Sequence, residues 1–361
     1  MSTAPHVSVI IPVYNAQKYV GEAIRSIVAQ TYSDLEIVVV DDASTDSSME
    51  EVRRVKDGRV RLVQNRVNGG QSRARNAGFE AAQGRYLALL DADDVALSDR
   101  IARQVDYLDR HPSVGLLGTS YSYLDGAGGF QGAFHVPENP VSVLWRLLVS
   151  NPIGTSTIMM RREVLDAAGC FDSGFAFAED LEYWGRVALV AGIGQIDVPL
   201  TAYRVHGGSL SGTTPHAIAA EAAARAHQKN VRRLTGLDVR LESLKVLAGG
   251  APSSDAQLLA AYGDLDALAA AFVRRWSPDA GLRRVVLGEV ATVLLKLARV
   301  NDHLRLRAIR SIARFVREAG LGVGVSPSLW ALVARVLPPR EVREIVKRIW
   351  RTSQTLKAWR T

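Results

Sequence analysis

Leu35-Glu-Ile-Val-Val-Val-Asp41-Asp42-Ala-Ser44-Thr-Asp46 is the stretch of this sequence that decides the fold. Its first half is a short β-branched run that is apolar on both faces, as in a strand at the middle of a sheet covered by helices on both sides. Its second half is a cluster of carboxylates and hydroxyls, where the chain should leave the sheet and enter a helix. Because ligands of such sheets bind at the carboxyl ends of the strands, the cluster predicts acidic groups in a ligand crevice.

Strand and helix signals alternate on both sides of this stretch. We predict strands at residues 7–13, 60–64 and 86–90, with helices at about 23–28, 45–55 and 72–82 between them. This alternation predicts an α/β fold, a doubly wound and mainly parallel sheet with flanking helices. From about residue 218 the strand signals vanish and Ala/Leu/Arg-rich segments of helical period continue. We therefore expect a catalytic domain at residues 1–215 and an all-helical region at 216–361.

Composition supports two units with different surfaces. The 361 residues are 47% hydrophobic and 22% charged, the balance of a globular protein. Residues 1–217 carry 19 Lys and Arg against 25 Asp and Glu, whereas residues 218–361 carry 25 against 12. Such a basic region favours anionic partners. We recognise no secretory signal and no apolar run of the ~20 residues that span a bilayer, and the lone Cys170 fits a reducing compartment. These features predict a cytoplasmic protein.

A second acidic cluster, Asp91-Ala-Asp93-Asp94, follows the predicted strand at 86–90. Three carboxylates this close repel one another unless a cation or donors neutralise them. Mg²⁺ or Mn²⁺ takes one or two protein carboxylates and leaves other positions to phosphate oxygens, so the spacing predicts a metal that bridges to a diphosphate. A charged turn that opens the next helix is the alternative interpretation.

A glycine turn that feeds a helix, Asn68 to Gly78, lies between the two clusters. Its helix opening can bind anions through backbone N–H groups. The turn is neither a Walker loop nor a GxGxxG motif, which disfavours a dehydrogenase. In the first cluster, Asp42 can accept a hydrogen bond from a uracil-like base, while Ser44 or Asp46 can cap the following helix.

The order of these motifs resembles the family-2 glycosyltransferases, which have the nucleotide-sugar-binding GT-A fold. The resemblance covers about residues 6–211 and rests on segments at residues 9–15, 36–46, 68–78, 89–94 and 177–184. It implies that Pro12 and Tyr14 border the nucleotide, that Asp42 contacts the base and that Asp180 is the catalytic base. It also implies that Asp91 and Asp93 form a DxD site for ribose and metal. The predicted nucleotide site comprises Pro12, Tyr14, Asp41, Asp42, Asn68, Arg75 and Asp91.

Four further residues are weaker candidates. Glu179, beside Asp180, is the next candidate for the base, although both carboxylates would also satisfy a helix dipole. Arg204 and His206 could reach the diphosphate or the metal, and His206 is a candidate third metal ligand, although a histidine in a Gly-rich loop is usually just solvated. Trp184 is a candidate acceptor contact.

The resemblance implies an inverting transferase that uses a nucleoside-diphosphate sugar, UDP-linked in our expectation. A carboxylate would deprotonate an acceptor hydroxyl while the metal stabilises the leaving diphosphate. We expect a glycan or lipid-linked acceptor in cell-envelope or surface polysaccharide synthesis. A catalytically silent scaffold of the same fold and a nucleotidyltransferase are the alternatives. The second would need a basic, Gly-rich triphosphate loop, where residues 12–18 are Pro-Val-Tyr-Asn-Ala-Gln-Lys.

The C-terminal segment predicts a basic amphipathic helix. Its apolar residues recur at helical spacing among arginines and lysines, namely Val342, Ile345, Val346, Ile349 and Trp350. Such helices lie in the interface of anionic bilayers, although most amphipathic helices simply pack onto protein. We expect residues 325–361 to hold the protein on the cytoplasmic face of a membrane, and we expect no nucleic-acid partner because no reader motif accompanies the basic residues.

Overall fold

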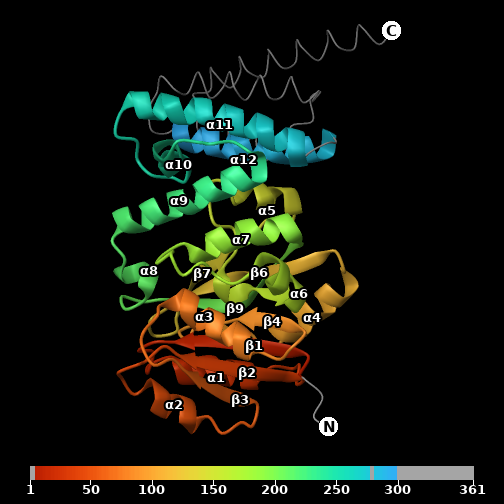
Figure 1. Ribbon diagram of the computed structural model, residues 1–361, viewed down its shortest axis with the longest axis vertical. Coiled ribbons are helices and arrows are strands. Elements are labelled where there is room, and N and C mark those ends of the chain that lie inside the picture. Colours follow the sequence, from red (N-terminus) through yellow and green to blue (C-terminus); the bar gives the residue numbers. More distant parts are fainter. Residues whose placement is uncertain (1–4, 277–279, 299–361) are drawn as a thin grey trace. The chain divides into compact units, whose positions relative to one another are not determined.

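The computed structural model describes residues 5–276 and 280–298 (Figure 1). The chain forms two compact units, Met1–Arg233 and Leu234–Thr361. The first unit extends beyond residue 215, because the N-terminal part of the long helix α9 (His216–Thr235) belongs to it. The predicted basic helix at residues 325–361 lies outside the described residues.

The first unit is built around a sheet of nine strands. The strands are β1 (Val7–Val13), β2 (Leu35–Asp41), β3 (Val60–Gln64), β4 (Tyr86–Leu89), β5 (Val95–Ala96), β6 (Val114–Asp125), β7 (Phe130–Phe134), β8 (Met159–Arg161) and β9 (Gly192–Val205). The helices that precede α9 are α1 (Val20–Val28), α2 (Ser48–Arg54), α3 (Gln71–Ala81), α4 (Arg100–Arg110), α5 (Pro140–Arg146), α6 (Arg162–Ala168), α7 (Glu179–Val190) and α8 (Leu210–Thr213), with a 3-10 turn, η1, at Thr155–Thr157.

The sheet is parallel in its first half and mixed in its second half. The strand order is β3-β2-β1-β4-β8-β6-β9-β5, and β7 pairs with β6 outside this path. Strands β1 to β4 pair in parallel, as the sequence predicts, because each is joined to the next by a helix. Strand β8 runs antiparallel to β4 and β6, while β6 and β9 are parallel. The α/β fold with flanking helices is confirmed, and the sheet is mixed.

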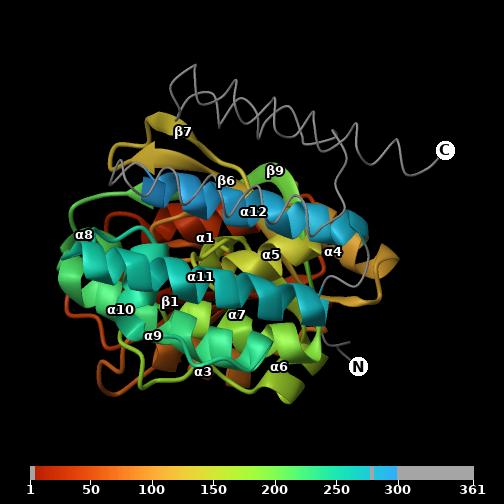
Figure 2. The same cartoon turned by 90° about the horizontal axis from the view of Figure 1, so that it is seen from above.

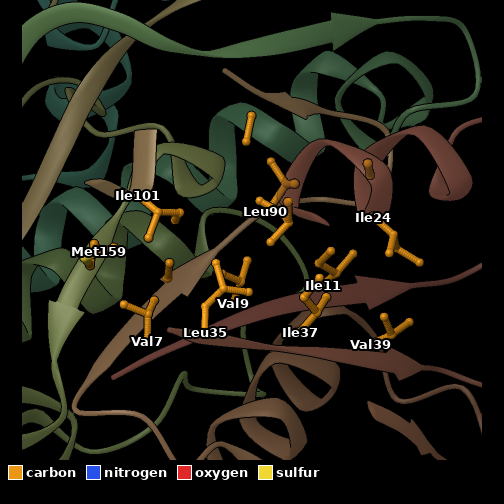
Figure 3. Packing of buried hydrophobic residues seen from close by; sticks show 14 of the residues in the cluster. Val7, Val9, Ile11, Ile24, Leu35, Ile37, Val39, Leu90, Ile101 and Met159 are labelled. Atoms are coloured by element: carbon orange, nitrogen blue, oxygen red, sulfur yellow. The ribbon is translucent and has the colours of Figure 1, made fainter. Parts of the chain in front are cut away.

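The core of this unit lies on both faces of the first four strands. On one face, Val9 and Ile37 pack with Ile24 of α1 and Ile101 of α4 (Figure 3). These side chains are fully buried. Successive side chains of a strand point to opposite faces of the sheet. Because helices cover both faces, nearly every position along β1 and β2 is buried, and both strands are therefore almost continuously apolar.

On the other face, α3 approaches the sheet through Gly78. A methyl group added at this position would lie 2.2 Å from Cγ2 of Ile10 and 3.2 Å from Cγ2 of Val40. The glycine thus lets the helix backbone contact the strands directly. This close approach fixes α3, whose first residues belong to the site described below.

The second unit is helical throughout its described residues, which confirms the expected change of architecture. It contains α10 (Leu241–Leu247), α11 (Asp255–Trp276) and α12 (Ala280–Ala298) (Figure 2). Among the described helices, α11 is long and apolar enough to cross a membrane, with a mean hydropathy of 1.3 over its best window. The sequence did not predict an apolar segment of this length. However, 44% of that window is buried inside the protein, and Leu265, Leu268 and Phe272 are fully buried as in a core helix.

The close packing at Gly78 makes a stability prediction. Gly78→Ala should destabilise the first unit by ~1–3 kcal/mol, because the methyl group overlaps side chains that the sheet holds in place. The control is Gly21→Ala in α1, where a methyl group meets only the exposed guanidinium of Arg25, 3.1 Å away. That variant should be neutral or stabilising, since alanine favours a helix by up to ~1 kcal/mol over glycine. Urea denaturation of both variants measures the difference; equal stabilities would refute the packing argument.

Candidate active site

A pocket of about 760 Å³ opens where β1, β2 and β4 end. It is lined by the loop after β1, by the start of α3, by the loop after β4 and by the loop after β9. The lining residues are 12–19, Asp42, Asp46, Asn68, Gly70, Gln71, Ala74, 91–93, Ala176, 206–209 and Thr213. The position agrees with the predicted crevice at the carboxyl ends of the strands. Of the predicted nucleotide-site residues, Pro12, Tyr14, Asp42, Asn68 and Asp91 line it, whereas Asp41 and Arg75 do not.

Two loops interlock at the rim of the pocket. The side chain of Asn15 accepts a hydrogen bond from the Thr45 amide at 2.8 Å, and the Asn15 amide donates to Ser44 Oγ at 3.2 Å. The Gln17 amide donates to Asp46 Oδ2 at 3.1 Å. Asp46, proposed from the sequence as a cap, therefore binds the neighbouring loop as well as Ser48. The sequence alone did not predict a role for Asn15 or Gln17.

Asp42 is a buried carboxylate that organises the glycine turn. It accepts the amides of Gly69 at 3.0 Å and Gly70 at 2.8 Å, and the side-chain amide of Asn65 at 2.8 Å. Gly70 has a φ of +82°, in the left-handed region that glycine adopts without strain. A carboxylate has about four acceptor positions, so a base could take at most the remaining one. Asp41 is also buried and accepts the Ser44 amide at 2.9 Å, which gives it a role in the loop.

Arg75 connects the acidic loop after β4 to helix α7. Its guanidinium lies 3.0 Å from Asp91 Oδ1 and 2.5 Å from Glu179 Oε1, and its side chain is only 2% exposed. It also donates to Gln71 at 3.0 Å. Asp91 and Glu179 raise the pKa of Arg75 further against the effect of burial, so it stays protonated. In this structure Arg75 holds two carboxylates and does not face the pocket.

Asp93 faces the pocket beside His206. Its Oδ2 lies 3.0 Å from Nε2 of His206, whose ring packs against Tyr19 at 4.7 Å between centroids. Burial and the nearby Asp91 raise the pKa of Asp93, while His206 lowers it. Among residues 5–276 and 280–298, no group of three His, Cys, Asp or Glu side chains is already arranged as a metal site. Two carboxylates on an open wall nevertheless fit Mg²⁺ or Mn²⁺, which obtain their other ligands from phosphate and water.

Asp94 and Arg204 support this loop from behind. Asp94 is buried and accepts the Arg204 amide at 2.8 Å. The Arg204 guanidinium donates to the Asp93 carbonyl at 2.9 Å and pairs with Glu22 at 2.9 Å. Arg204 is 3% exposed and does not line the pocket, so the predicted diphosphate contact is wrong for this structure: the guanidinium binds the backbone of the acidic loop instead.

Asp180 lies in the first turn of α7, next to the tethered Glu179. Its Oδ2 accepts hydrogen bonds from Asn151 at 2.8 Å and Thr155 at 3.0 Å. Burial and the Glu179 carboxylate raise the pKa of Asp180 to about 6, a value suited to a base that works near neutral pH. Ala178, just before the helix, has a φ of +60°, and Ala176 lines the pocket.

Trp184 belongs to the core. It is fully buried on α7 and packs against Tyr183 and Phe171, with ring centroids 5.4 Å and 6.1 Å away. The prediction that it contacts an acceptor is therefore wrong for this structure. The position of Trp184 in the motif does not show whether its side chain points to the core or to a ligand, because α7 buries residues on nearly all sides.

Comparisons with known proteins agree with this architecture. The model of glycosyl transferase family 2 matches residues 8–169. An uncharacterized glycosyltransferase of Haemophilus influenzae is 32% identical over 228 residues, which are 60% of this chain and 70% of that protein. The Escherichia coli UDP-Glc:alpha-D-GlcNAc-diphosphoundecaprenol beta-1,3-glucosyltransferase WfaP is 32% identical over 211 residues, 57% of this chain and 79% of that protein. An uncharacterized glycosyltransferase of Rickettsia felis is also 32% identical, but the match spans only 35% of its length.

A solved structure shares the fold. S. aureus TarS 1–349 in complex with UDP-GlcNAc has a TM-score of 0.56 and 19% identity, over 87% of this chain and 92% of that one. At this identity the likeness concerns the fold alone, and it covers the GT-A architecture together with the helices that follow. Relatives that match in sequence and a neighbour that matches in architecture lead to one conclusion: this chain is a glycosyltransferase and belongs to glycosyl transferase family 2.

Proposed function

We propose that the protein transfers a sugar, with inversion, from a UDP-linked donor to a hydroxyl of a glycan or lipid-linked acceptor in cell-envelope or surface polysaccharide synthesis. One observation carries this proposal. Two carboxylates, Asp91 and Asp93, line the pocket. Arg75 pairs with both Asp91 and Glu179, and so links the pocket to Asp180, a neighbouring carboxylate with a pKa of about 6. An inverting transferase requires these two functions, leaving-group stabilisation and a single base, at separate positions.

The donor would occupy the pocket with its base near the β1 and β2 loops. Pro12, Tyr14 and Asn68 line this part, and Tyr14 is half exposed, so that its ring is free to contact a nucleotide. The name of WfaP specifies UDP-Glc, and TarS was solved with UDP-GlcNAc. Both names support a UDP-linked donor for this chain.

The diphosphate would lie against the acidic loop. Asp91 and Asp93, with His206 as a further ligand, would hold Mn²⁺ or Mg²⁺ there. The metal would stabilise negative charge on the departing nucleoside diphosphate. Asp93 and His206 already contact each other on the pocket wall, with His206 Nε2 donating to Asp93 Oδ2. Binding of a metal by Nε2 would replace this hydrogen bond.

Asp180 would act on the acceptor. Its Oδ2 is oriented by Asn151 and Thr155, and it would take the proton of the acceptor hydroxyl as the oxygen attacks the anomeric carbon. The bond to the diphosphate oxygen breaks on the opposite face of the sugar, which inverts the anomeric centre. Glu179 is paired with Arg75 and is therefore the less suitable base.

A location at the cytoplasmic face of a membrane completes the proposal. The name of WfaP specifies a diphosphoundecaprenol acceptor, and residues 218–361 of this chain carry 25 basic against 12 acidic side chains. Attraction to anionic lipid contributes ~1 kcal/mol per well-placed Lys or Arg. The candidate amphipathic helix at 325–361 lies outside the described residues.

The metal assignment predicts the behaviour of an Asp93 variant. Asp93→Ala should abolish the Mn²⁺-dependent part of UDP binding while the melting temperature stays within a few degrees, because Asp93 is a partly exposed carboxylate next to Asp91. Asp99→Ala, which removes a carboxylate paired only with Arg103 at the surface, is the control and should bind like the wild type. Calorimetric titration with UDP, with and without Mn²⁺, measures the effect. Undiminished metal-dependent binding in Asp93→Ala would overturn the assignment.

The base assignment predicts both turnover and its pH dependence. Asp180→Asn should lower kcat by roughly 10²–10⁴ with donor KM changed only a few-fold, because the amide keeps the shape but cannot take a proton. In the wild type, kcat should fall with decreasing pH below about 6, as Asp180 becomes protonated, and should level off above it. The residual activity of Asp180→Asn should lack this acid limb. Asp166→Asn, an exposed carboxylate on α6, is the control. A variant that retains wild-type turnover would move the base elsewhere.

A further inference from the structure

Four aromatic side chains that do not line the donor pocket gather on the ends of β6, β7 and β9. The Tyr121 ring lies 5.3 Å from Tyr123, 5.1 Å from Phe134 and 5.7 Å from Tyr203, measured between centroids. Tyr123 and Tyr203 are 6.1 Å apart and perpendicular. We call these four residues the aromatic platform. β6 and β7 run side by side as an antiparallel pair (Figure 2).

The platform lies on the face of the sheet that carries η1. Thr201, two residues before Tyr203 on β9, donates through Oγ1 to the Ser156 carbonyl at 3.2 Å. The Tyr121 ring packs against Gly154: its Cε1 lies 3.2 Å from the position that a Cβ atom at residue 154 would occupy. Side chains two residues apart on a strand share a face, so the tyrosines continue this face outward from η1.

The same turn holds the proposed base. Thr155, which follows Gly154, donates to Asp180 Oδ2 at 3.0 Å, and Asn151 donates to the same oxygen at 2.8 Å. Tyr121 therefore packs on Gly154, the residue next to Thr155, and Thr155 orients Asp180. The lining of the donor pocket contains none of the four aromatic residues, and it includes Ala176 in the segment just before α7.

The platform is incompletely covered. All four rings are only partly buried, although they cluster like core residues. Opposite Tyr123 on β7 stands Gly132, and a methyl group added there would meet no atom within 4 Å. The space beside the Tyr123 ring is thus open among the described residues. Partly exposed tyrosines with a few polar groups beside them are typical of ligand sites that need an apolar surface and a wet edge.

We propose that the aromatic platform is the acceptor subsite, and that it binds a saccharide ring by stacking its C–H face on Tyr123 and Tyr203. This inference rests on the proposed transfer reaction, which requires an acceptor hydroxyl at Asp180. A sugar ring has apolar faces and a polar edge, so that it matches a group of aromatic rings of which one, Tyr121, packs on Gly154, the residue before Thr155. The platform determines which acceptor is used and has no part in donor binding.

The test separates stacking from packing through paired substitutions. Tyr123→Phe and Tyr203→Phe keep the ring, while Tyr123→Leu and Tyr203→Leu keep an apolar side chain without a ring face. Tyr107→Leu is the control, because Tyr107 stacks on His111 and lies outside the platform. Melting temperatures of all five variants show whether they fold. The Tyr123 hydroxyl makes a long 3.5 Å contact with Tyr121, so Tyr123→Phe should fold normally.

Saccharide binding is measured by saturation-transfer NMR with a panel of methyl glycosides of common hexoses and N-acetylhexosamines. We expect at least one glycoside to bind the wild type, the Phe variants and Tyr107→Leu. The folded Leu variants should bind it at least ten-fold more weakly. Absence of binding by the wild type to the whole panel, or equal binding by the Leu variants, would overturn the subsite.

Hydrolysis of UDP-glucose in the absence of acceptor distinguishes this inference from the proposed function. This slow reaction should need Asp93 but should be unchanged in the Leu variants, because the platform does not contact the donor. Ring-dependent glycoside binding without hydrolysis of UDP-glucose would refute the proposed donor and leave the saccharide site in place. Donor turnover with ring-independent glycoside binding would refute only the subsite.

Discussion

The buried charge of Arg75 is the constraint on which the site depends. A guanidinium removed from water costs several kcal/mol unless it is paired in good geometry, and Arg75 is paired with both Asp91 and Glu179. These partners come from the loop after β4 and from the first turn of α7, which are far apart in sequence. Pairing them through one rigid fork fixes the distance between the acidic loop and Asp180. It also separates two adjacent carboxylates by function: Glu179 is tied to the arginine, and Asp180 is left with a raised pKa.

Backbone strain is concentrated around the same region. Among the described residues, the non-glycine residues with positive φ are Asn15, Ala43 and Ala178. Each stands in a loop that contributes to the pocket or to the turn before Asp180. Such conformations cost ~1–3 kcal/mol and persist only where neighbours over-determine them. Here the hydrogen bonds between Asn15 and the loop at Ser44 and Thr45 supply that restraint. The rim of the pocket is thus preformed.

The sequence predicted the parts of the fold that depend on local patterns. Strands β1 to β4 lie within a residue or so of their expected bounds, because each is a short apolar run between turn signals. Strands β6 and β9 were not predicted, because Tyr121, Tyr123 and Tyr203 give them a mixed, half-exposed pattern. Their pairing also joins segments about 80 residues apart, which no local pattern can show. Motif order located the acidic loop and Asp180. It could not tell that Trp184 and Arg204 turn inward, because direction depends on the packing of α7 and on β9, which no local pattern encodes.

The acidic cluster shows how the fold resolves the repulsion that the sequence implies. Three carboxylates within four residues cannot all carry an uncompensated charge. Arg75 compensates Asp91. Asp94 is buried, and burial together with Asp93 and Asp91 raises its pKa well above the usual range. Asp91 and Asp93 both line the pocket, and Asp93 has the ring of His206 beside it. The fold has therefore turned a repulsive triplet into two carboxylates that line the pocket, one paired with Arg75 and one beside His206, and a third that is buried behind them.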